Sequence, residues 1–180
     1  NSTVLEFDFT PLTNFISFDY LFASNEYQDD FPCRFSDGFA FLIKEKGSTA
    51  NYQNLAVIPG TTTPVSSLNI HPIILPFGVG GGCPAKNGNY FGGYSSATSP
   101  TNYSAQTVVM NAQANVIAGT TYHIKLVIAD DTFQYYDSAV FLKAGSFSPK
   151  IDLGPDRLLT TNNPICFGES YIIDTKLPAS

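Results

Sequence analysis

Residues 14–23 read NFISFDYLFA and alternate in the way that is typical of a β-strand with one buried face. Large apolar and aromatic side chains occupy every second position from Ile16 to Phe22 and share one face. The opposite face carries the polar residues Ser17 and Asp19. Because side chains alternate across a strand, this pattern predicts a strand that packs one face against a core.

Similar patterns recur along the chain and favour an all-β protein. TYHIKLVIA at 121–129 alternates between inward apolar and outward polar positions, with His123 and Lys125 on the outer face. In DSAVFLKAG at 137–145, Val140 and Leu142 share a face. Further strands are expected at 4–9, 38–44, 54–58, about 70–75 and 105–117. About eight strands joined by long loops predict a two-sheet antiparallel β-sandwich with a jelly-roll-like arrangement.

Composition supports this class and argues against others. Among the 180 residues, 15 Phe and 10 Tyr suit half-buried strands, while 14 Gly and 12 Pro favour turns. The net charge of −6 argues against nucleic-acid binding, which needs a basic track. No apolar run is long enough to span a membrane as a helix. No start methionine or signal peptide is visible, so we expect a mature chain or an excised fragment.

Two segments stand apart from the strands. Residues 76–103 are rich in glycine and tyrosine, and a connection of this length is usually functional or disordered. Its aromatic residues favour an ordered loop. Exposed tyrosines contact sugars or proteins, although packing of the loops onto the sandwich is the alternative. The ligand-contacting candidates are Tyr90, Tyr94, Tyr103 and Tyr135.

Residues 149–180 are too few for a core of their own and predict the opening strands of a second module, or a strand pair docked on the first.

The cysteines are Cys33, Cys83 and Cys166, an odd set without a CxxC pair. Sparse lysine and abundant Asn, Thr, Ser and Tyr suggest an exported protein. In that setting Cys33 and Cys83 are candidates for a disulfide; three buried free thiols are the alternative. Cys166 would then need a partner outside this fragment.

Acidic residues cluster in two segments that each follow a predicted strand, at 19–37 and 130–137. Clustered carboxylates repel one another unless a cation or water lies between them, and calcium prefers six to eight oxygen ligands. If the two strand ends are neighbours, the loops jointly bind calcium; the alternative is a solvated acidic surface. The expected ligands are Glu26, Asp37, Asp130 and Asp137, with Asp30 and Asp131 in reserve.

Enzyme interpretations find little support. His71 precedes a proline in an apolar stretch, and no pattern links it or His123 to a nucleophile. Glu26 and Asp137 would suit a glycosidase only if they faced each other across a cleft. The glycines at 78–82 lack the Lys-Ser/Thr pair of a phosphate-binding loop.

Three segments together resemble the choice-of-anchor L domain of secreted and surface proteins, notably of Bacteroidota. They are FDYLFASNEYQDDFPCRFSDGFAFLI at 18–43, NLAVIPGTTTPVSSLN at 54–69 and YHIKLVIADDTFQYYDSAVFLKAGSF at 122–147. The resemblance covers roughly residues 3–148 and gives domain boundaries of 1–148 and 149–180. The chain departs from the family pattern where Asn25 replaces an acid and where Phe133 replaces another, while Asp131 is an extra acid.

The resemblance implies type IX secretion and display in a large multidomain surface protein, without catalytic activity. The tail resembles the start of immunoglobulin-like or PKD-like repeats, which would then be neighbours in the same chain. Together these features predict a calcium-stabilised, lectin-like adhesin module that contacts a glycan or another cell-surface protein, without nucleic-acid binding or membrane insertion. A structural spacer without a ligand is the alternative.

Overall fold

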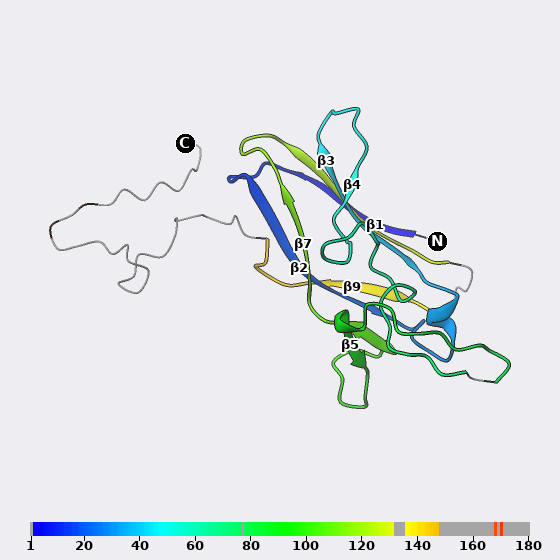
Figure 1. The fold of residues 1–180 in the computed structure, drawn as a ribbon. Coiled ribbons are helices and arrows are strands. Elements are labelled where there is room, and N and C mark those ends of the chain that lie inside the picture. Colours follow the sequence, from blue (N-terminus) through cyan, green and yellow to red (C-terminus); the bar gives the residue numbers. More distant parts are fainter. Residues whose placement is uncertain (1, 77, 132–135, 148–167, 169, 171–180) are drawn as a thin grey trace.

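The computed structural model describes residues 2–76, 78–131 and 136–147, together with Gly168 and Ser170. These residues form two antiparallel sheets with a sandwich-like arrangement, and two short 3-10 turns are their only helical elements (Figure 1). The predicted all-β fold is therefore confirmed. The predicted second module, including Cys166, lies outside the described residues apart from Gly168 and Ser170, and stays a prediction.

Sheet 1 has the strand order β1-β8-β3-β4. Its central strand β8 pairs with β1 along one edge and with β3 along the other, over eight residue pairs on each side. The bounds of its strands are β1 Ser2–Phe9, β8 Tyr122–Ala129, β3 Gly38–Glu45 and β4 Gln53–Asn54.

Sheet 2 is built around the long strand β2, Phe15–Ser24. Tyr20 pairs with Met110 and also with Leu142, so β7 and β9 must flank β2 on opposite sides. Strand β6 continues along the β7 side and carries β5 beyond it. The bounds are β5 Phe91–Tyr94, β6 Ala105–Thr107, β7 Met110–Asn115 and β9 Ser138–Leu142, with the 3-10 turns η1 Phe31–Cys33 and η2 Gly88–Tyr90.

The core forms where the alternating faces of the two sheets meet. The inward face of β2 is buried as predicted, and Phe18 of β2 packs on Phe41 of β3 with ring centroids 4.9 Å apart. Ile124 and Leu126 of β8 close the core from sheet 1. Outward-facing His123 instead contacts the carboxylate of Asp8, with Nδ1 2.6 Å from Oδ1.

Some predicted strand boundaries were wrong. Residues 70–75 form only isolated bridges, in which His71 pairs with Lys86 and Ile74 with Cys83. Most of the predicted strand at 54–58 lies outside β4, which ends at Asn54. The predicted strand at 105–117 is interrupted at 108–109, where Val108 donates its N–H to the carbonyl of Tyr90 instead. Pro72 removes a backbone donor within 70–75, and Pro59 and Gly60 directly follow 54–58. The diverted hydrogen bond of Val108 interrupts 105–117.

The structure joins Cys33 and Cys83 in a disulfide, with Cα atoms 5.8 Å apart. This confirms the first of the two interpretations of the cysteines. The bridge anchors the glycine-rich segment 78–86 to η1, so that the long connection between residues 76 and 103 is held at Cys83 as well as by β5.

Candidate functional site

The two acidic loops lie side by side at one end of the sandwich. One loop leaves β2 and enters β3, and the other leaves β8 and enters β9. Ser24 at the end of β2 pairs with Ser138 at the start of β9, and Gly38 at the start of β3 pairs with Ala129 at the end of β8. Both loops therefore run from one sheet to the other, between the β2–β9 pair and the β3–β8 pair (Figure 1). We call the region where they meet the acidic junction; it comprises Glu26, Asp37, Asp130, Asp131 and Asp137.

Backbone contacts tie the loops together directly. The N–H of Asn25 donates to the carbonyl oxygen of Asp137 at 3.0 Å. The side-chain oxygen Oδ1 of Asn25 accepts the N–H of Ser104 at 3.0 Å, which fastens the segment before β6 to the same place. The predicted proximity of the two loops is thus a feature of this fold.

Glu26 is the most deeply placed acid of the first loop. It is only 2% exposed, and its Oε2 accepts the N–H of Asp37 at 2.6 Å and the hydroxyl of Ser67 at 3.2 Å. Ser67 is itself buried. No sequence signal pointed to Ser67, because its segment carries no acid and joins the junction only through the tertiary fold.

Asp37 is buried even more completely, at 1% exposed. Its Oδ1 accepts the N–H of Asp131 at 3.2 Å. Its Oδ2 is enclosed and has no hydrogen-bond partner among the described residues. A buried carboxylate oxygen without a donor costs free energy, so this atom is the clearest unmet requirement in the junction.

The electrostatics of the junction reflect this crowding. Burial raises the pKa of Glu26 to about 7, and the Asp37 and Asp131 carboxylates add to the rise, while the hydrogen bonds from Asp37 and Ser67 oppose it. Burial also raises the pKa of Asp37. The nearby Ser138 hydroxyl opposes that rise, although the hydrogen bond it donates goes to Ser24 Oγ at 2.8 Å.

Asp130 and Asp137 border Asp37, and their negative charges contribute to its raised pKa. In the described part of the chain, no lysine or arginine forms an ion pair with Glu26, Asp37 or Asp137. The reserve candidate Asp30 has a different partner, since Arg34 Nη2 lies 2.5 Å from its Oδ2.

The described side chains do not form a ready-made metal centre. No three carboxylate, imidazole or thiol groups in 2–76, 78–131 and 136–147 are arranged to hold an ion. Asp131 and Asp137 are exposed at the surface, whereas Glu26 and Asp37 are fixed by burial. An ion at Asp37 would therefore need inward rotation of these outer acids, together with backbone or water oxygens.

A cleft of about 420 Å³ opens beside the junction, between the β1–β8 side of sheet 1 and β9. Asp130, Asp137 and Tyr103 all line it. Tyr103 is half-buried and meets the ring of Phe141 at 6.2 Å between centroids. The cleft thus brings one predicted ligand-contacting tyrosine together with two predicted metal ligands.

The other predicted tyrosines lie elsewhere. Tyr90 packs against the core, and Tyr94 is 56% exposed on β5 with its ring 5.1 Å from that of Phe91. Tyr135 lies outside the described residues. Neither Tyr90 nor Tyr94 lines the cleft beside the acidic junction.

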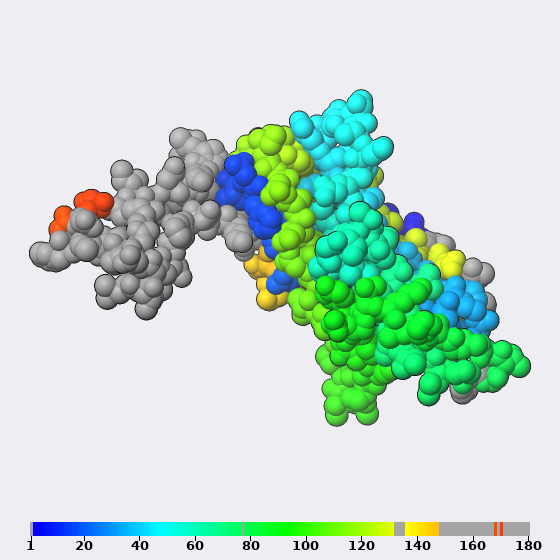
Figure 2. Space-filling view, viewed as in Figure 1, coloured from blue at the N-terminus to red at the C-terminus, as the bar shows by residue number. Residues whose placement is uncertain are grey.

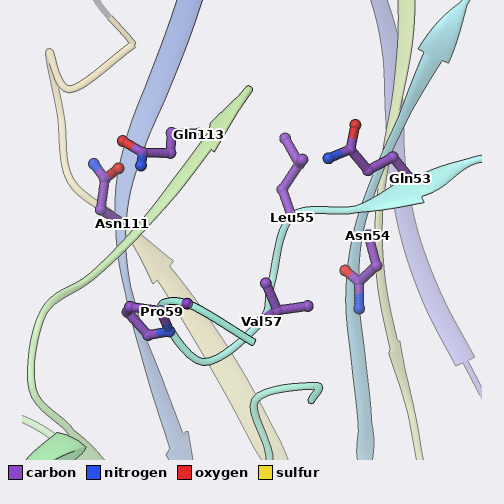
Figure 3. Close-up of a pocket in the computed structure, with 8 residues that line it drawn as sticks. Gln53, Asn54, Leu55, Val57, Pro59, Asn111 and Gln113 are labelled. Atoms are coloured by element: carbon purple, nitrogen blue, oxygen red, sulfur yellow. The ribbon is translucent and has the colours of Figure 1, made fainter. Parts of the chain in front are cut away.

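A second opening lies on the opposite edge of the sandwich, between β7 and residues 53–60, and we call it the amide groove (Figure 3). It has a volume of about 550 Å³. The space-filling view shows the two walls adjacent on one face of the molecule (Figure 2). It is lined by Gln53, Asn54, Leu55, Val57, Pro59, Gly60, Asn111 and Gln113.

No helix in the described part of the chain is both long and apolar enough to cross a membrane. The family model of the choice-of-anchor L domain matches residues 1–148. No curated protein and no solved structure matches this sequence.

Proposed function

Because the chain belongs to the choice-of-anchor L domain family, which places it among secreted or surface-anchored proteins, we propose that residues 1–148 form a non-enzymatic adhesion module. In this proposal, calcium stabilises the acidic junction, and the adjoining cleft contacts a glycan or a protein of another surface. The observation that carries the proposal is the buried Oδ2 of Asp37, which has no hydrogen-bond partner among the described residues and lies beside the buried Glu26.

Calcium suits the chemistry of this site because it prefers carboxylate, carbonyl and water oxygens and accepts irregular geometry. Asp37 and Glu26 would provide the buried side of the site, and Asp130, Asp131 and Asp137 the outer side. Bound calcium would supply positive charge where the buried acids Glu26 and Asp37 lie close together. It would also hold the two loops at fixed positions, and so shape the cleft.

The cleft has the residue types that a surface contact needs. Tyr103 presents an aromatic ring, and Asp130 and Asp137 provide oxygens that accept hydrogen bonds from hydroxyl or amino groups. Calcium-dependent ordering of the acids would make binding of the partner depend on calcium. Further immunoglobulin-like or PKD-like modules would carry this contact surface away from the cell.

The first experiment measures thermal unfolding of the full chain in calcium and in chelator. A ligand that binds only the folded state stabilises it by mass action, so calcium should raise the Tm in a concentration-dependent way. Asp37→Asn should abolish most of this rise. Asp29→Asn serves as the matched control, because Asp29 is an exposed acid of the same loop and asparagine accepts its positive φ of 47°.

The second experiment measures binding to a glycan array and to surface proteins, with and without calcium. Tyr103→Ala should lose binding, whereas Tyr94→Ala, a tyrosine outside the cleft, should retain it. Equal Tm values in calcium and chelator would contradict the calcium part of the proposal. A calcium-induced Tm rise without any binding would identify the domain as a structural spacer.

A further inference from the structure

The amide groove differs from the acidic junction in its position and in the residues that line it. It lies on the β4–β7 side of the sandwich, whereas the cleft of the junction lies on the β1–β9 side. No charged side chain lines it. Its functional groups are side-chain amides and backbone groups, which are both donors and acceptors.

One wall of the groove is an open sheet edge. The N–H of Val116 donates to the carbonyl oxygen of Asn14, so even-numbered residues of β7 direct their backbone groups toward β2. Asn111 and Gln113 alternate with them and direct their N–H and C=O groups away from β2. No hydrogen bond in the described part of the chain uses these four backbone groups.

Two of the four amide side chains are fixed by the protein itself. Asn54 Oδ1 accepts the N–H groups of Phe41 and Ala56, each at 3.0 Å. Asn111 Nδ2 donates to Ser17 Oγ and to Asp19 Oδ1, each at 2.8 Å. These bonds leave Asn54 Nδ2 and Asn111 Oδ1, one donor group and one acceptor, in fixed positions.

The other two amides, those of Gln53 and Gln113, make no hydrogen bond within the described residues. Both side chains are exposed. Gln53 extends from its strand toward the gap between the two walls, with Leu55 and Val57 beside it and Pro59 at one end (Figure 3). The groove therefore combines unused amides with an apolar surface.

The nearest acid does not make the groove anionic. Asp19 is held by Asn111 and also lies 3.2 Å from Lys143 Nζ, and these two contacts lower its pKa. Its charge is thus balanced outside the groove. A lining of this kind offers nothing to compensate the desolvation of a charged ligand, so it selects an uncharged one.

We propose that the amide groove is a binding site for a neutral carbohydrate. Neighbouring sugar hydroxyls both donate and accept, which matches the side-chain amides and the open edge of β7, while the C–H face of a sugar ring packs on Val57 and Pro59. A volume of about 550 Å³ lies within the usual range for small-ligand sites and suits one or two sugar units. This site is independent of calcium, since none of its lining residues belongs to the acidic junction.

The test uses the full chain and an array of neutral mono- and disaccharides with their sialylated and sulfated counterparts. The best neutral sugar is then titrated against Gln53→Ala, Gln113→Ala and the double variant. Each loss of a hydrogen-bonding amide should weaken binding by about tenfold. Asn115→Ala is the matched control, because Asn115 is an exposed amide of β7 that does not line the groove.

The expected result is binding of neutral sugars that persists in chelator and in Asp37→Asn, and that is lost in the double glutamine variant while Asn115→Ala binds normally. No binding to any neutral sugar, preference for charged glycans, or unchanged affinity of the double variant would overturn the inference. Binding that disappears in chelator or in Tyr103→Ala would instead assign the sugar to the junction cleft. The experiments can therefore refute the amide-groove proposal and the calcium proposal independently of each other.

Discussion

Asp37 and Asp131 lie 94 positions apart in the sequence, yet the N–H of Asp131 donates to Oδ1 of Asp37 at 3.2 Å. Glu26 is held in the same way, by the N–H of Asp37. Backbone amides thus hold Glu26 and Asp37, and neither acid forms an ion pair with a lysine or arginine in the described part of the chain. The junction consequently keeps its shape through neutral donors, and an added cation would stabilise an arrangement that the fold already provides.

This arrangement predicts an unusual dependence of stability on pH when calcium is absent. Glu26 has a pKa of about 7 in the folded state, above the ordinary value of 4.5, so between these values the folded state binds more protons than the unfolded state. Stability is therefore greatest at low pH within this window and falls as pH rises through it. Chemical denaturation of chelated protein should show a loss of roughly 3 kcal/mol between pH 4.5 and 7.5.

The control for this pH dependence is Glu26→Gln, which keeps the shape of the side chain and removes its titration. Burial also raises the pKa of Asp37, so the stability of the Glu26→Gln variant should still fall with rising pH, but less steeply. Saturating calcium should flatten the profile of the unsubstituted protein. A stability that increases steadily from pH 4.5 to 7.5 in chelator would contradict the proposed state of Glu26.

The alternation of apolar and polar residues along single strands was sufficient to predict which residues form the core. The buried face of β2 and the central strand β8 both follow from it, because side-chain direction in a strand depends only on position. The nearness of the two acidic loops was also a correct prediction, since both loops follow strands. In the structure, Asn25 and Asp137 are joined at this point by a backbone hydrogen bond.

The remaining features depend on contacts that local pattern does not encode. Ser67 reaches Glu26 only because the irregular segment after β4 folds back over the junction. The amide groove combines Gln53 and Gln113 from different sheets, and each of these residues is an ordinary exposed amide in its own strand. The segment at 70–75 has apolar residues like a strand, but its pairing is confined to single bridges.

The Cys33–Cys83 disulfide should contribute strongly to stability, because it closes a loop of 50 residues. Replacing both cysteines by serine should lower the free energy of unfolding by roughly 3–4 kcal/mol in the chain-entropy model. Denaturation with urea measures this difference. The comparison is made in a Cys166→Ser background to prevent thiol exchange, and an unchanged unfolding midpoint would show that the bridge does not form in solution.

Gly82 should not tolerate a side chain. A Cβ atom at this position would collide with the carbonyl oxygen of Ile74 and with the backbone that follows it. Because the obstacle is backbone, relief requires the Ile74–Cys83 bridge to separate, so Gly82→Ala should lower the Tm by several degrees. Gly81→Ala is the matched control, since its Cβ would meet open space, and equal Tm values for the two variants would contradict this packing.

Asn25 stands where the family pattern has an acid, and its environment explains how the chain accepts an amide there. Its Oδ1 only accepts hydrogen bonds, from the N–H of Ser104 at 3.0 Å and from the Ser104 hydroxyl at 3.4 Å, so an aspartate would make the same contacts. Asn25→Asp should therefore fold normally. The added charge beside Asp137 should lower the Tm in chelator and increase the gain in Tm on adding calcium, because a further carboxylate both repels the junction and attracts the ion. Asn69→Asp, a change of the same charge in another loop, should leave the calcium response unaltered; an equal response in both variants would show that the negative charge of the junction does not govern calcium binding.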